Sequence, residues 1–209
     1  MLLKKLFKNK RGIVGIEAAI VLIAFIIIAA ALSYVIINMG FYTTQKTKET
    51  MQSGLEESLS ALQPDGVLIG KTDGSSYIEY LIFPVKVSAG RAAVDLSANS
   101  VVVSVYLPNA TLMNIHQGAV TTNTTTWDDL NPILALGANE AKFAIYNGNN
   151  NTVLESTEKA FLVIHLGVGQ RIADYDTVKI EVRPTIGAAL TVAFTAPGGM
   201  LANSFVDLG

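Results

Sequence analysis

The chain begins with a long stretch of apolar residues. Residues 18–37 contain no charged side chain, and residues 11–40 read RGIVGIEAAIVLIAFIIIAAALSYVIINMG. At about 1.5 Å per residue, a helix of this length crosses the hydrocarbon core of a bilayer. The pattern therefore predicts a membrane-crossing helix. The function depends on whether that helix is removed as a signal, stays as an anchor, or moves into another apolar environment.

The next segment, residues 41–63, changes from uniformly apolar to one-sided. Its large apolar residues fall at the spacing of a single helix face, and the charged residues lie off that face. They are Met51, Leu55, Leu59 and Leu62. We therefore predict one continuous helix over residues 13–63. The proline at position 64, followed by Gly66, is expected to end it.

Beyond Gly66 the hydrophobic period changes to that of strands, with turns rich in Gly, Asn, Pro and Ser between them. The main runs are residues 77–87, 92–107, 142–146, 159–168, 177–182 and 190–196. Residues 159–168 are almost continuously apolar, which favours a central strand, whereas Pro84 indicates an edge or a bulge. Residues 108–132 are predicted to form a long polar loop or a weak hairpin.

Together these patterns predict an α+β chain, in which a long N-terminal hydrophobic helix precedes an antiparallel, immunoglobulin-like β-sandwich. We divide it into a leader (residues 1–12), a helix (13–63) and a β domain (64–209). Such a β domain is large enough to bury its own core. The chain contains no cysteine, which excludes disulfides and cysteine-based metal or nucleophile sites.

The net charge of −2 conceals an uneven distribution. Five basic residues and no acidic residue lie in positions 1–12, so the remaining chain carries 10 Lys and Arg against 17 Asp and Glu. A basic flank before an apolar run stays in the cytoplasm while the following part crosses the membrane. The acidic remainder lacks the basic face that nucleic-acid binding requires, and we expect no such partner.

The leader and helix resemble a known family. KNKRG followed by IVGIEAAIVLIAF is similar to the class III signal of archaeal flagellins (archaellins) and related type IV pilins. In that family a membrane peptidase of the prepilin type cuts after the glycine and leaves the apolar helix on the mature chain. The resemblance places the cut between Gly12 and Ile13. It also makes Glu17 the fifth residue of the mature chain, where type IV pilins carry a glutamate.

The similarity continues through NMGFYTTQKTKETMQSGLEES and returns in KIEVRPTIGAALTVAFTAPGG. It implies a structural subunit of the archaellum, an extracellular filament turned by an ATP-driven motor. The implied partners are copies of the chain, the peptidase, the membrane before assembly, and the motor with its assembly platform. An archaeal adhesion pilin is the alternative. A membrane-anchored enzyme would need clustered catalytic residues, and the sequence offers none.

Glu17 is an acid close to the start of the apolar stretch. A carboxylate in the middle of a membrane costs about 2.5–3.5 kcal/mol, and intramembrane acids are usually functional. Two interpretations remain open. Four residues after Ile13, Glu17 can simply reach the interface, or it can pair with the free Ile13 amine of a neighbouring subunit after the cut.

Three N-x-S/T sequons follow the membrane segment and are candidate glycosylation sites, although about two are expected by chance. They begin at Asn109, Asn123 and Asn150. The two histidines are His116 and His165, and His165 is interpreted as a core or sheet-surface residue. No HExxH, Walker A or paired-histidine spacing is present, so we expect no metal, no cofactor and no enzymatic activity.

Overall fold

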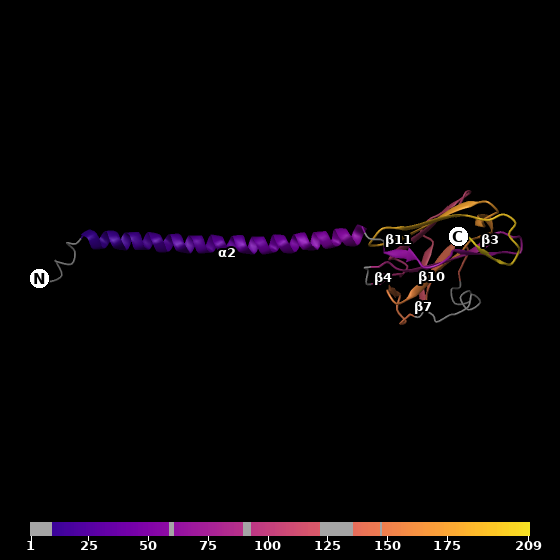
Figure 1. Cartoon of the computed structure of the whole chain (residues 1–209), viewed down its shortest axis with the longest axis horizontal. Coiled ribbons are helices and arrows are strands. Elements are labelled where there is room, and N and C mark those ends of the chain that lie inside the picture. Colours follow the sequence, from indigo (N-terminus) through magenta and orange to yellow (C-terminus); the bar gives the residue numbers. More distant parts are fainter. Residues whose placement is uncertain (1–9, 59–60, 90–92, 122–135, 147) are drawn as a thin grey trace. The chain divides into compact units, whose positions relative to one another are not determined.

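The structure is a computed structural model that describes residues 10–58, 61–89, 93–121, 136–146 and 148–209, with side chains from residue 15 onward. The chain divides into two compact units, residues 1–54 and 55–209, and each is considered by itself. The first contains most of one helix and the second contains the strands (Figure 1).

Helix α2 runs without a break from Lys10 to Ser58, a length of 49 residues. At the α-helical rise its length is about 74 Å. Gly40 and Gly54 lie inside it without interrupting it, and no proline occurs in its sequence. The long helix expected from the apolar run is therefore present (Figure 1).

The end of the helix differs from the prediction. We predicted helix to residue 63, but α2 ends at Ser58 and Leu62–Pro64 forms strand β1. Pro64 disfavours helical backbone at Gln63, and pairing with β3 holds Leu62–Pro64 in an extended conformation. Leu62 pairs with Val87 of β3 and is 1% exposed, so it belongs to the β-domain core and not to a helical stripe. Leu59 lies outside the described residues.

Twelve further strands follow β1 among the described residues, together with a short 3₁₀ helix, η1 (Val168–Gln170). They are β2 (Ile69–Thr72), β3 (Ile78–Val87), β4 (Ala93–Asp95), β5 (Val101–Tyr106), β6 (Thr111–Leu112), β7 (His116–Thr121), β8 (Glu140–Tyr146), β9 (Val153–Glu155), β10 (Lys159–His165), β11 (Thr177–Pro184), β12 (Leu190–Thr195) and β13 (Phe205–Asp207).

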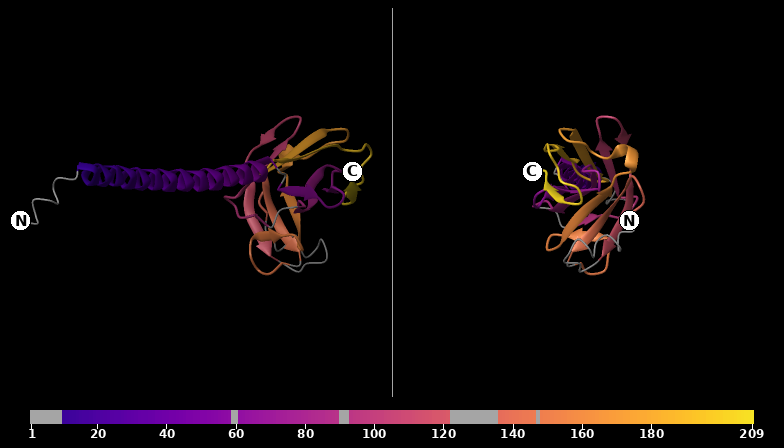
Figure 2. Two further views of the ribbon diagram at one scale, coloured as in Figure 1. Left: turned by 60° about the vertical axis from the view of Figure 1, so that its left-hand side comes forward. Right: turned by 90° about the vertical axis from the view of Figure 1, so that its right-hand side faces the viewer.

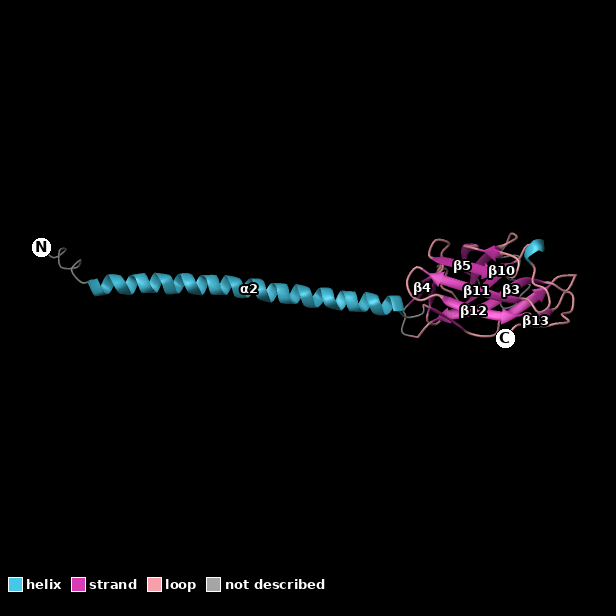
Figure 3. Cartoon of the chain, turned by 90° about the horizontal axis from the view of Figure 1, so that it is seen from above, coloured by secondary structure: helices cyan, strands magenta, loops and turns pink. Residues whose placement is uncertain are grey.

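These strands form two main sheets (Figure 3). The larger has the order β13-β2-β3-β10-β8-β7, with β1 also paired to β3, and the smaller has the order β12-β11-β5-β6. Strands β4 and β9 make a separate pair. The central position predicted for residues 159–168 is confirmed for Lys159–His165, because β10 lies between β3 and β8, whereas Val168 begins η1.

One pair departs from the antiparallel expectation. Strand β7 runs parallel to β8, whereas the other strand pairs described are antiparallel. The polar segment 108–132, predicted as a loop or hairpin, contributes β6 and β7 to two different sheets, and its residues 122–132 lie outside the description. The fold class is confirmed as a long apolar helix followed by an antiparallel-rich sheet domain.

Pro84 lies within β3 at a central place in the larger sheet, so the suggestion of an edge was wrong. The carbonyl oxygen of Pro84 accepts a hydrogen bond from Asp65 N at 3.0 Å. A strand residue directs its N–H and C=O to the same side, so the proline nitrogen faces the gap between β1 and β2. The backbone hydrogen bonds between β3 and β10 therefore lose no N–H donor.

The core of the β domain is built from both sheets and from the β4–β9 pair. Figure 2 shows the strands of this domain from two further directions. Side chains on alternate residues of β5 and β11 face inward, as their burial patterns show. The largest fully buried residues include Phe83 and Phe143 from the larger sheet and Leu154 from β9. The domain therefore has a packed hydrophobic core, and the chain contains no cysteine that could cross-link it.

Candidate assembly surface and site residues

The main functional feature is the exposed apolar surface of α2. Every described side chain from residue 15 to residue 58 is exposed. Phe25 is 70% exposed, Ile36 64% and Phe41 65%. The span Gly15–Ser58 has a mean hydropathy of 3.1 in its most apolar window and meets the length and composition of a membrane-crossing helix. Such a surface requires lipid or other apolar helices around it.

The segment after the apolar run is less polar on its surface than its sequence indicates. Four threonine hydroxyls bond to backbone carbonyls one turn earlier, at 2.8–2.9 Å. They belong to Thr43, Thr44, Thr47 and Thr50. Because the hydroxyls are used within the helix, the threonine methyl groups are available for packing. These methyl groups therefore add apolar surface to α2 between Gly40 and Met51.

The residues predicted at the processing site lie at the start of this helix. Gly12 and Ile13 have helical backbone, and their side chains lie outside the description. Glu17 is exposed and lies one helical turn from Ile13. No described side chain offers Glu17 a partner within its own chain.

Two of the three sequons lie on exposed loops of the β domain. Asn109 is exposed in the turn between β5 and β6. Asn150 is exposed in the loop between β8 and β9 and has a positive φ of 69°. Both side chains are therefore accessible to a modifying enzyme. Asn123 lies outside the described residues.

His116 is a buried structural residue. Its Nε2 lies 3.0 Å from the carbonyl oxygen of Leu96, and its Nδ1 faces the amide of Gly118 at 3.5 Å. A neutral ring that carries its proton on Nε2 satisfies both contacts. Burial lowers the pKa of His116, although nearby backbone carbonyls oppose part of that effect. The ring also packs edge-on against Phe143.

His165 lies on the outer side of β10, in keeping with its interpretation as a sheet-surface residue. It stacks on Tyr80 with ring centroids 4.4 Å apart. Its Nδ1 lies 2.9 Å from the carbonyl oxygen of Gly137 and must donate to it. The other ring nitrogen lies 3.7 Å from Glu79 Oε1. These contacts hold Gly137, which precedes β8, against β10.

A charged cluster that sequence reasoning missed surrounds Arg171. Its guanidinium contacts Asp73 Oδ2 and Glu79 Oε1, each at 2.5 Å, across 98 and 92 positions of sequence. Burial would raise the pKa of Asp73. The backbone amides of Tyr77 and Ser75 and the guanidinium outweigh burial and hold that pKa below its usual value. No local sequence signal connects these three segments.

A second acidic centre is Asp65, which contacts Lys86 at 2.7 Å and Lys159 at 2.5 Å. Hydrogen bonds from Lys159 and then Lys86 lower the pKa of Asp65 against the effect of burial. This cluster holds β1, β3 and β10 together at one end of the larger sheet. Its polar groups are paired with one another.

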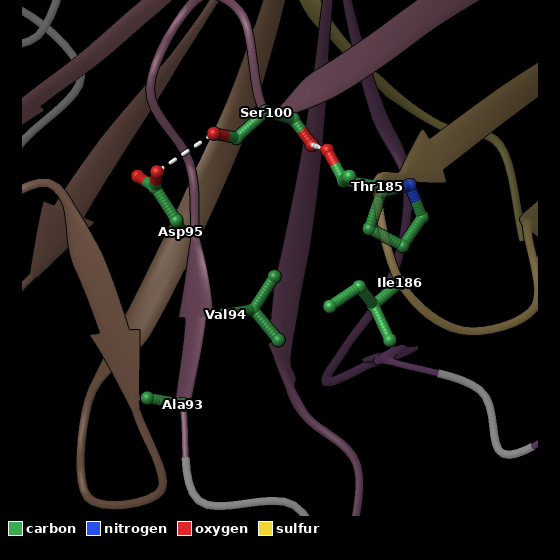
Figure 4. A pocket seen from close by; sticks show the side chains of 7 residues that line it. Ala93, Val94, Asp95, Ser100, Thr185 and Ile186 are labelled. Carbon is green, nitrogen blue, oxygen red and sulfur yellow. Dashed lines mark hydrogen bonds between the residues drawn. The ribbon is translucent and has the colours of Figure 1, made fainter. Parts of the chain in front are cut away.

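Figure 4 shows a shallow pocket of about 260 Å³ between β4 and the start of the β11–β12 connection. Asp95 accepts a hydrogen bond from Ser100 Oγ at 2.7 Å, and Thr185 Oγ1 donates to the Ser100 carbonyl oxygen at 2.8 Å. The Ser100 hydroxyl lowers the pKa of Asp95 in spite of burial. These hydrogen bonds connect the β4–β5 turn to Thr185, and the polar groups that line the pocket bond to one another.

Comparisons with known proteins agree with this arrangement. A family model described as archaeal-type flagellin matches residues 12–194. A probable flagellin of Aeropyrum pernix is 43% identical over 205 residues, which cover 97% of this chain and 100% of the relative. A probable flagellin of Archaeoglobus fulgidus is 33% identical over 218 residues, with 97% and 98% covered.

Solved structures show the same likeness. The archaeal flagellum of Methanospirillum hungatei matches with a TM-score of 0.59 and 28% identity, over 93% of this chain and 99% of that chain. A crystal structure of an archaeal flagellin from Methanocaldococcus jannaschii matches 70% of this chain and 95% of its own, with a TM-score of 0.60. At 16% identity the second match shows the fold alone.

Proposed function

The chain belongs to the archaeal-type flagellin family, and from this premise we propose how it is processed, assembled and exposed on the cell. It is a structural subunit of an extracellular archaellum filament and assembles with its own copies into a helical polymer. The single observation that carries this function is the fully exposed apolar helix α2 on a chain of this family. The comparisons give the adhesion-pilin alternative no support, and the absence of enzymatic activity stays a prediction.

The chain is made as a membrane-inserted precursor and is cut between Gly12 and Ile13 by a peptidase of the prepilin type. The basic leader holds the N-terminus in the cytoplasm, where the glycine provides a small residue at the cut. N-terminal sequencing of sheared extracellular filaments tests this step. A start at Ile13 is expected, whereas a start at Met1 or near Leu32 would contradict it.

After processing, α2 exchanges lipid for copies of itself in the filament core. Lipid chains and apolar helices are similar solvents, so the hydrophobic gain is small and close packing must supply specificity. Exposed threonine methyl groups extend the packing surface beyond the apolar run. The contact is head-to-tail and does not close, which produces a fibre. The motor and its assembly platform are the further partners proposed.

Glu17 gains a candidate ionic partner when the cut creates a new N-terminus. The cut creates an ammonium group on Ile13, and Glu17 pairs with that group on a neighbouring subunit. Two opposite charges removed from water need such a pair, because an unpaired buried carboxylate is costly. The simpler interpretation, in which Glu17 only reaches the membrane interface, predicts that its charge has no effect on filament formation.

The outer surface carries glycans on sequon asparagines. Asn109 and Asn150 are exposed in loops, which supports modification at these positions, and Asn123 remains a third candidate. Mass spectrometry of filament peptides is expected to find a glycan on at least one of them, removed by the matching Asn→Gln substitution. Unmodified asparagine at all three positions would contradict the proposal.

A further inference from the structure

Strand β12 ends the smaller sheet with an open edge. It pairs with β11 from Leu190 to Thr195, and the sheet order places it at the end of β12-β11-β5-β6. Figure 3 labels the two strands next to each other. Within the described part of the chain, the outer side of β12 makes no backbone hydrogen bond.

The hydrogen-bond pattern identifies the groups at this edge. Ala196 N donates to Asp176 O at 2.9 Å, so this pair of residues is hydrogen-bonded across the ladder. Bonded and non-bonded pairs alternate in an antiparallel ladder. Thr191, Ala193 and Thr195 therefore direct their N–H and C=O groups away from β11. Their side chains are exposed and uncharged.

The edge of β12 lacks the features that keep strands from pairing with other chains. Natural proteins blunt edges with charge, proline, bulges or very short strands. The sequence LTVAFT has neither charge nor proline, and its register with β11 is regular over six residues.

The other edge strands described do carry such protection. Strand β6 has two residues, and β13 has three and ends in Asp207. Strand β7 has an irregular register between His116 and Ala119, with Gly118 at a φ of 113°. The contrast indicates that the β12 edge has a partner when the protein performs its function.

We propose that β12 is an interaction surface for a second copy of this chain, which adds an extended segment to the free edge within the filament. The inference rests on the proposed assembly into a filament, where every subunit has identical neighbours at fixed distance. Backbone hydrogen bonds of added strands give affinity without charged side chains, which fits the composition of β12. An uncharged edge left open on an extracellular protein would instead favour aggregation.

The polarity of the filament limits which segment of the neighbour can pair. Two β12 strands that pair with each other make a two-fold contact, which closes into a dimer. A filament with head-to-tail contacts requires two different surfaces. The neighbour therefore contributes an extended segment other than its own β12.

Amide hydrogen exchange tests the contact on the full chain, in intact filaments and in subunits released from them. The amides of Thr191, Ala193 and Thr195 are expected to exchange about tenfold or more slowly in filaments than in released subunits. The inward amides of Val192 and Phe194 serve as the internal reference, because β11 protects them in both states. Equal exchange of the three outward amides in the two states would overturn the proposal.

Ala193→Pro removes one outward N–H without removing a bond to β11, and Ala193→Val is the matched control that keeps the N–H. Ala193→Lys tests the same edge by charge and keeps the backbone intact. We expect proline and lysine, but not valine, to lower the filament dissociation temperature while released subunits unfold as the wild type does. Unchanged filaments of both the proline and lysine variants would overturn the contact at β12. A wild-type chain that forms no filament would contradict the assembly itself, so the two failures are distinguishable.

Discussion

At the scale of single residues, several carboxylates of the β domain accept hydrogen bonds within turns. Asp73, Asp95 and Asp176 each accept a backbone amide within a few positions. Arg171 is different, since it joins segments that are distant in sequence. Its side chain is 21% exposed and that of Asp73 is 7% exposed, so loss of the guanidinium leaves a poorly hydrated carboxylate.

Arg171→Ala is expected to destabilise the β domain by about 2–3 kcal/mol, because it leaves two neighbouring carboxylates without their shared cation. Arg183→Ala is the matched control, since Arg183 pairs with Glu181 but its side chain is 67% exposed. Its cost is expected to stay below about 1 kcal/mol. Urea unfolding of the full chain in detergent, followed by tyrosine near-UV circular dichroism, measures both. An equal loss of unfolding free energy in the two variants would show that the Arg171 cluster stabilises the domain no more than a surface ion pair does.

Glu17→Gln keeps the size of the side chain and removes its charge. If Glu17 pairs with the Ile13 amine of a neighbour, the number of filaments per cell should fall by about tenfold, because the substitution leaves a buried ammonium group without its partner. Precursor processing should be unchanged. Glu49→Gln on the same helix is the control, because Glu49 pairs with Lys46 at 2.8 Å within its own chain. Electron microscopy gives the count, and normal filament number and length would refute the pair.

At the scale of elements, the important boundary lies between α2 and β1. Residues 51–62 carry apolar side chains at helical spacing, and among the described residues Met51 and Leu55 lie on the helix surface. Leu62 is in the core of the β domain. Similar apolar residues therefore have two different roles. Those on the helix surface serve association between subunits, and those in the domain core serve folding.

Leucine-to-alanine substitutions distinguish these purposes. Leu62→Ala is expected to destabilise the β domain by about 2–5 kcal/mol through the cavity it leaves. Leu55→Ala, at a side chain 61% exposed, should leave the unfolding of released subunits unchanged and affect only filament stability. Denaturant unfolding of subunits and thermal dissociation of filaments provide the two readouts. If both substitutions weakened only filaments, Leu62 would belong to the helix stripe after all.

At the scale of the whole molecule, the lowered pKa values of four side chains predict how acid changes the stability of the β domain. The pKa of His116 is below its ordinary value of 6.5, mainly through burial. The pKa values of Asp65, Asp73 and Asp95 are below 3.8. A group with a lowered folded-state pKa contributes stability above its unfolded pKa and loses it as the pH falls.

The β domain should therefore lose stability as the pH falls below about 6.5, because the unfolded chain binds a proton at His116 more readily than the folded chain does. It should lose stability again below about 3.8, because the unfolded chain also binds protons more readily at the three aspartates. Thermal unfolding of released subunits between pH 8 and pH 3 measures both steps (about one titrating group in the first and three in the second). His116→Gln should remove the first step and leave the second. A stability that rises on acidification would contradict the lowered pKa values of His116 and the three aspartates.

The sequence by itself determined the features that depend on local pattern. The apolar run, its length and its basic flank follow from residues that are adjacent in the chain, and these residues specified the helix and the resemblance to archaellins. The strand at Lys159–His165 followed from an almost continuous apolar run, and the strand at residues 177–182 followed from alternating apolar positions. These signals are local because helix and strand periods are set by backbone geometry.

Only the tertiary structure decided the features that depend on distant pairing. Three features require knowledge of which strands are neighbours. They are the place of Leu62 in the β-domain core, the parallel pairing of β7 with β8, and the position of Pro84 between its partner strands. The same is true of the Arg171 cluster and the open edge of β12. A sequence shows which residues alternate, but edge, register and long-range ion pairs are properties of the packed sheet.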